Sequence, residues 1–123
     1  MLALTVAEVA AIEARRLERL RVRRVSYLRH VATDPLRDVP DEAVRAHIDI
    51  SERTGERLAL RSHDAHCRWA YLMFATEGRI ARSQEVRHFI ARPGADPDKQ
   101  MALVMRGTIL ALRRQRSAMF GGA

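Results

Sequence analysis

Apolar residues recur at helical spacing along most of the chain. In residues 4–32 no Gly or Pro interrupts the pattern, and its apolar positions cover about a third of a helical wheel. These positions are Val6, Val9, Leu17, Leu20, Leu28 and Val31. Further apolar stripes predict a second helix from Pro40 or Asp41, a third over 56–76 and a short fourth over 84–91.

Turn and capping residues separate these segments. Asp34-Pro35 and Val39-Pro40 predict a loop over 33–40, because a residue before Pro avoids the helical region. Gly55 is expected to break or kink the second helix, since Gly costs about 1 kcal/mol relative to Ala there. Gly78 suits a left-handed cap, and Ser83 suits the N-cap of the fourth helix. No alternating β-branched run predicts a strand.

The last segment, 97–116, contains the most apolar stretch of the chain. Within 101–112 only Arg106 is charged, and the apolar residues point all round the wheel, as in a helix enclosed by others. Asp96 and Pro97 suit the N-cap and first turn. The stretch is shorter than the about 20 residues of a membrane span. The predicted fold is a compact all-α bundle of about five helices around this buried C-terminal helix.

Length and composition predict one small domain. A chain of 123 residues with 47% hydrophobic residues is long enough for a single modest core, so 1–123 is expected to be one helical domain. Cys67 is the only cysteine, which excludes an internal disulfide. With no apolar leader in view, a reducing, cytoplasmic setting is expected.

The charge favours a polyanionic partner. The net charge is +7, and every cation except Lys99 is an arginine, which binds phosphate through two parallel hydrogen bonds. Codon bias in a GC-rich genome would equally explain the choice of Arg over Lys, but not the excess of positive charge. Residues 1–32 carry +4, 33–56 carry −4, 57–92 carry +4 and 93–123 carry +3. This pattern predicts a basic face and a separate acidic face, the latter turned to a neighbouring protein.

Two groups of arginines are candidate phosphate contacts, one in the first helix and one around the fourth. The alternative for each is an ordinary solvated helix face. The candidate residues are Arg15, Arg16, Arg19, Arg23, Arg79, Arg82, Arg87, Arg113 and Arg114. Arg24 falls on the apolar side of the first helix, where it either extends to solvent or meets a partner. Few aromatic residues accompany the arginines, which favours backbone contact with weak sequence preference.

No pattern supports a metal site or a catalytic site. His63, His66 and Cys67 lie close together in sequence, but a structural zinc site takes four ligands and no second pair is found. Glu85 and His88 form a single Glu-x-x-His motif, whereas a di-iron bundle needs two. No Gly-rich loop or oxyanion site accompanies a nucleophile. We therefore predict no cofactor and no enzymatic activity.

The run from Arg82 to Phe89, Arg-Ser-Gln-Glu-Val-Arg-His-Phe, resembles a Ser-Gln-Leu-Arg-Lys-Phe type of segment. That segment occurs in the small helical subunits of CRISPR effector complexes, from which this run departs by one extra residue between Gln84 and Arg87. Those subunits are short, basic and all-helical. The resemblance implies an RNA-guided complex as partner, strand contacts at Arg82 and Arg87, and no catalysis by this chain.

Two functions are therefore expected of such a chain. The first is a non-catalytic small helical subunit that binds a nucleic-acid backbone within a ribonucleoprotein of the CRISPR effector kind. Other subunits, including further copies of this chain, would be its protein partners, and no membrane is involved. The alternative is a protein-interaction module (an adaptor, immunity protein or chaperone) whose basic face meets an acidic protein.

Overall fold

The computed structural model of the chain describes residues 3–120 and, within this range, all side chains except those of residues 112 and 116–120. The described part is all-α, without a strand, which confirms the predicted fold class. Its elements are α1 (Val6–Val31), α2 (Thr33–Leu36), α3 (Asp41–Arg57), α4 (His63–Ala75), the 3-10 turn η1 (Arg79–Arg82), α5 (Gln84–Ile90) and α6 (Pro97–Phe120).

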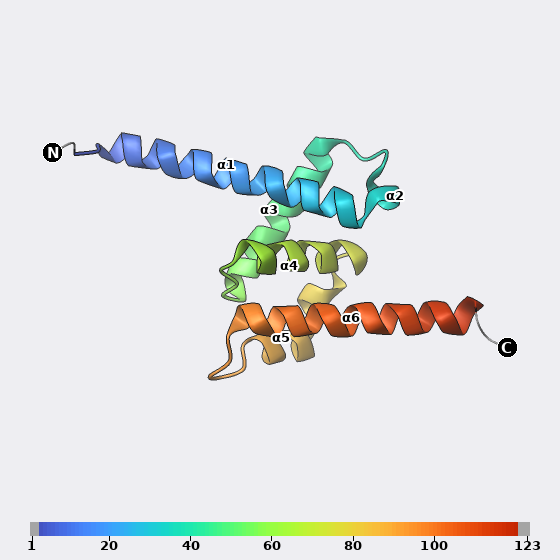
Figure 1. Cartoon of the computed structure of the whole chain (residues 1–123). Helices are drawn as coiled ribbons and strands as arrows, with labels where there is room; N and C mark the ends of the chain where they lie inside the picture. Colours follow the sequence, from blue (N-terminus) through green and yellow to red (C-terminus); the bar gives the residue numbers. More distant parts are fainter. Residues whose placement is uncertain (1–2, 121–123) are drawn as a thin grey trace.

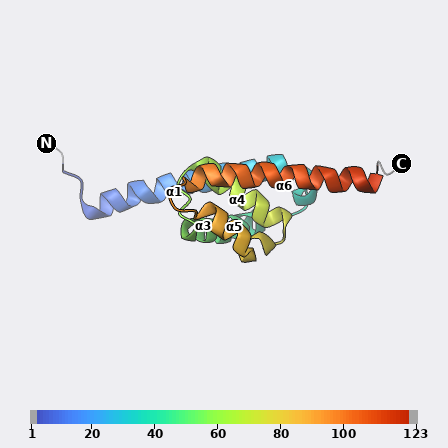
Figure 2. The ribbon, with the colours of Figure 1, turned by 90° about the horizontal axis from the view of Figure 1, so that it is seen from below.

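Helix α4 lies at the centre of the arrangement, between α1 on one side and α6 on the other (Figure 1). Helices α3 and α5 lie together on one face of this row, as the view from below shows (Figure 2). The first half of α1 and the second half of α6 extend past the body in opposite directions (Figure 1). Only the inner halves of the two long helices therefore contribute to the packed core.

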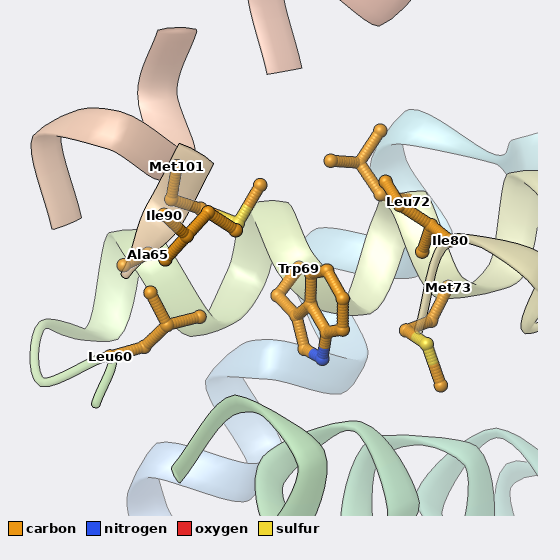
Figure 3. Packing of buried hydrophobic residues seen from close by; sticks show 8 residues of the cluster. All are labelled: Leu60, Ala65, Trp69, Leu72, Met73, Ile80, Ile90 and Met101. Carbon is orange, nitrogen blue, oxygen red and sulfur yellow. The ribbon is translucent and has the colours of Figure 1, made fainter. Parts of the chain in front are cut away.

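Two groups of buried side chains meet at α4. One surrounds Trp69 and joins α4 to η1, α5 and α6 (Figure 3). Its members are Leu60, Ala65, Trp69, Leu72, Met73, Ile80, Ile90 and Met101. The other joins α4 to α1, α2 and α3 through Leu28, Ala32, Leu36, Val44, Ile48 and Ala70. Because α4 contributes to both groups, it is the enclosed helix of this fold.

The C-terminal helix does not occupy the central position that the sequence predicted. Met101 is fully buried against α4, but Leu103 is 50% exposed and Leu110 46%. The reason is length: α6 has 24 residues and α4 has 13, so at about 1.5 Å per residue α6 extends past its partner. The apolar stripe of α1 is likewise covered only in part, since Leu28 is buried whereas Val6 is 88% exposed.

Local signals placed most helix ends correctly. Gly78 adopts the left-handed conformation with φ 79°, and the Ser83 hydroxyl accepts a hydrogen bond from the Val86 amide at 3.3 Å. The Asp96 carboxylate accepts one from the Asp98 amide at 3.0 Å, as an N-cap does. The predicted loop over 33–40 includes the short helix α2.

The third helix begins at His63 and not at residue 56. Ala59 has a positive φ of 63°, which breaks the helical path after α3. The Asp98 carboxylate of α6 then accepts hydrogen bonds from the backbone amides of Arg61 and Ser62, at 2.9 and 3.0 Å. This long-range contact fixes the non-helical connection between α3 and α4. The local sequence pattern does not predict it, because Asp98 is 36 and 37 positions away from the residues that it binds.

Gly55 does not break its helix, contrary to the prediction. Helix α3 continues through Gly55 to Arg57, and the glycine is buried against α4. A Cβ at this position would lie 3.0 Å from His66 Nδ1 and 3.3 Å from Trp69 Cδ1. The close approach of α3 and α4 thus requires a residue without a side chain at position 55.

Gly55→Ala is expected to lower the free energy of unfolding by about 1 kcal/mol. Overpacking costs about 1–3 kcal/mol, which outweighs the gain of about 1 kcal/mol in helix propensity. The matched control is Gly107→Ala in α6, where a Cβ meets nothing within 4 Å and the propensity gain alone should stabilise the protein. Urea unfolding followed by circular dichroism measures both variants. Equal stabilisation by the two substitutions would contradict the packing role of Gly55.

Candidate nucleic-acid interface

All ion pairs among the described side chains involve arginines of the first half of the chain. Arg24 of α1 lies 2.8 Å from Glu52 of α3, and Arg21 lies 3.6 Å from both Asp49 and Glu52. The other pairs are Arg16–Glu13, Arg29–Asp41, Arg37–Asp34 and Arg45–Glu18. Arg24, which lies on the apolar side of α1, therefore meets a carboxylate of its own chain and does not extend to solvent.

Several carboxylates of helix α3 form ion pairs with arginines of α1. Asp49 and Glu52 face the arginines of α1, and Asp41 binds Arg29. The predicted separate acidic face is therefore wrong for these carboxylates, because α1 and α3 pack side by side. Residues 1–56 contain ten cations and ten acids, so this half of the chain is neutral.

The second half of the chain holds the whole net charge. Residues 57–123 contain twelve cations and five acids. In the described part of this half, no arginine guanidinium lies within 4.0 Å of a carboxylate. The excess positive charge consequently belongs to the part of the chain that follows the end of α3 at Arg57.

The predicted arginines do not form one surface. Arg15, Arg19 and Arg23 are exposed on α1, whereas Arg16 pairs with Glu13 at 2.9 Å. Arg79, Arg82 and Arg87 are exposed on η1 and α5, and Arg113 and Arg114 on the far half of α6. Because α1 and α5 lie on opposite sides of α4, the single basic face expected from the sequence divides into separate regions (Figure 1).

The turn from Gly78 to Ser83 offers guanidinium groups but no free run of backbone amides. The amides of Arg79, Ala81 and Ser83 donate to the carbonyls of Thr76, Gly78 and Ile80, at 3.0 to 3.2 Å. The amide of Ile80 donates to the Thr76 hydroxyl, and its side chain is buried. These amides are therefore not free to donate to a phosphate chain, because hydrogen bonds within the protein already occupy them.

The structure adds Arg57 and Arg92 to the candidate arginines, and Arg57 is far in sequence from the fourth helix. Arg57, at the end of α3, lines an open hollow of about 660 Å³ together with Arg87 and His88 of α5 and with Arg92. Thirty positions separate Arg57 from Arg87, so no spacing rule relates them. The only signal in the sequence is that the basic part of the chain starts at Arg57.

His63 and Cys67 are neighbours on α4 but are poorly suited to nucleophilic chemistry. Cys67 Sγ lies 3.4 Å from His63 Nε2. Burial raises the pKa of the Cys67 thiol to about 11, so the sulfur stays protonated at neutral pH. Burial, with Arg23 and Arg24 nearby, lowers the pKa of His63. Among the side chains described, no three His, Cys, Asp or Glu residues gather closely enough to hold a metal ion.

Exposed, unpaired guanidinium groups around a shallow hollow are suited to binding anions. Arginine forms paired hydrogen bonds with phosphate and stacks on flat rings, and backbone contacts of this type position a strand without reading its sequence. None of the described helices combines the length and the apolar character that a membrane crossing requires. Comparison with models of protein families, with curated proteins and with solved structures found no match to this chain.

Proposed function

We propose that this chain is a non-catalytic protein that binds the backbone of a nucleic acid as a subunit of a ribonucleoprotein. The observation that carries the proposal is the unequal distribution of charge. The first half of the chain is neutral and contains every described ion pair, whereas the second half contains twelve cations, five acids and no described ion pair. Excess charge of this kind raises the local concentration of a polyanion and strengthens its binding.

The distribution of aromatic residues favours backbone contacts over base reading. Trp69 is buried, and Tyr71 and Phe74 are packed against the two cores. Among the described aromatic side chains, only Phe89 of α5 is exposed. The bound strand is accordingly held with weak sequence preference.

The proposed setting is an RNA-guided complex of the CRISPR effector kind. Its support is the resemblance of residues 82–89 to the segment found in the small helical subunits of those complexes. Arg82 and Arg87, the two positions to which the resemblance assigns strand contacts, are exposed on η1 and α5. They also lie on the half of the chain that has the excess charge.

Strand binding should weaken steeply with salt. If about six phosphates are contacted, the slope of log affinity against log salt is expected to be about −4 to −5. Replacing Arg79, Arg82 and Arg87 by alanine should reduce the steepness by about 2 to 3. The matched control replaces Arg15, Arg19 and Arg23, which removes equal charge from α1 and should change the slope less. Fluorescence anisotropy with labelled RNA measures all three proteins, and a slope near zero for the unmodified protein would exclude the function.

A second candidate function is docking to an acidic protein. The observation in its favour is the uncovered surface of the projecting half of α1, where the apolar Val6, Val9 and Ile12 are exposed together with the basic Arg15 and Arg19. The same titration separates the two functions. A protein-docking module would bind no strand at low salt, whereas the proposed subunit would bind both RNA and DNA under that condition.

A further inference from the structure

The hollow beside α5 is formed by two segments that are far apart in sequence, the end of α3 and the stretch from α5 to the start of α6. The end of α3 contributes Arg57, α5 contributes Arg87 and His88, and the connection to α6 contributes Arg92. Leu58, Ala59, Ile90, Ala91, Ala95 and Pro97 supply apolar lining. Its volume of about 660 Å³ lies within the range of about 300–1,000 Å³ that is typical of small-molecule sites.

We propose that this hollow holds one unpaired nucleotide of a bound single strand. The inference rests on the proposed function and specifies it: the chain would prefer single strands to duplexes. The phosphate would lie against Arg57, Arg87 and Arg92, and the base would cover the apolar lining. A base in a duplex is stacked and paired, so only an unpaired base can enter a hollow of this kind.

The polar groups of the hollow match the parts of a nucleotide. Guanidinium groups bind phosphate through two parallel hydrogen bonds. The imidazole of His88 and the flat faces of the arginines provide surfaces on which a base stacks. The side-chain amide of Gln84, which also lines the hollow, carries both donors and an acceptor for a base edge. A hollow that bound only an apolar ligand would not need arginine, histidine and glutamine side chains in its lining.

The walls of the hollow are fixed by hydrogen bonds within the chain. The amides of Leu58 and Leu60 both donate to the Gly55 carbonyl, at 3.0 and 3.1 Å, and shape the wall after α3. The Gln100 side chain of α6 donates to the Phe89 carbonyl at 3.0 Å, which holds the end of α5. A site that is ordered before binding loses less conformational entropy when a nucleotide enters.

The test compares a single strand and a duplex of about ten residues, as RNA and as DNA, by fluorescence anisotropy. The unmodified protein should bind the single strand at least about fivefold more tightly. The double variant Arg57→Ala, Arg92→Ala should lose this preference. The control Arg53→Ala, Arg106→Ala removes equal charge from exposed positions outside the hollow and should keep it.

A second pair of variants separates the contribution of base stacking to single-strand affinity from the contribution of charge. His88→Ala should weaken single-strand binding by about fivefold or more, while His88→Phe, which keeps a flat ring, should restore it. If the two double variants lose the same affinity for both strands, or if duplex and single strand bind equally, the hollow is not a nucleotide site although the proposed function stands. If the unmodified protein binds neither strand at low salt, the proposed function itself fails.

Discussion

Replacing Trp69 by alanine is expected to lower the free energy of unfolding by about 3–5 kcal/mol. Trp69 is 1% exposed and lies between the side chains that join α4 to η1, α5 and α6 (Figure 3). Its indole Nε1 donates to the Thr54 hydroxyl of α3 at 2.7 Å, so one residue also connects α4 to α3. A domain of this size has a total stability of about 5–15 kcal/mol, so the loss would be a large part of it.

The measurement is urea unfolding followed by circular dichroism, because the variant has no tryptophan left to report by fluorescence. Trp69→Phe is the control: it keeps a ring in the core but loses the indole N–H, and should cost less than the alanine variant. A loss below about 1 kcal/mol for Trp69→Ala would contradict the position of α4 at the centre of the core.

The all-α fold was predictable because its signals are local. Helical spacing of apolar residues, Ser83 and Asp96 as N-caps, and Gly78 as a left-handed cap each depend on a few neighbouring residues. Gly55 shows the limit of such signals. Helix propensity treats glycine as a breaker, whereas close packing of α3 against His66 and Trp69 requires it.

The identity of the central helix depended on tertiary packing. Residues 101–112 contain one charged residue, Arg106, and residues 65–75 likewise contain one, Arg68. Both segments thus predict an enclosed helix. The difference is that α4 has neighbours on several sides, while α6 extends beyond α4 and leaves Leu110 uncovered. No periodicity in a single segment contains that information.

The candidate site was predictable in its parts but not in its grouping. Arg82 and Arg87 were found by charge and by resemblance, yet Arg57 joins Arg87 only through the way α3 and α5 end at one hollow. The pairing of α1 with α3 had a clear signal, since segments 1–32 and 33–56 carry equal and opposite charge. That signal was interpreted as two faces, although helices adjacent in sequence commonly pack together.

Replacing Glu52 by alanine is expected to lower the free energy of unfolding by about 3 kcal/mol. Arg24 is 6% exposed, its Nε has no hydrogen-bond partner, and Glu52 at 2.8 Å is its counter-charge. Without Glu52 a guanidinium that cannot lose its proton stays buried and unpaired. Urea unfolding at neutral pH measures the loss.

Arg24→Met is the informative control, because it removes the buried charge and keeps the hydrophobic volume. It should cost only about 1 kcal/mol, since Glu52 keeps Arg21, 3.6 Å away, as a second counter-charge. The double variant should then be more stable than Glu52→Ala alone, and simple additivity would contradict the ion pair. Glu52→Ala adds one positive charge to the neutral half of the chain, where α3 contacts α1 and outside the hollow lined by Arg57 and Arg87. Strand binding should therefore change little while stability falls, which separates the structural ion pairs of α1 and α3 from the binding role proposed for the arginines from Arg57 onward.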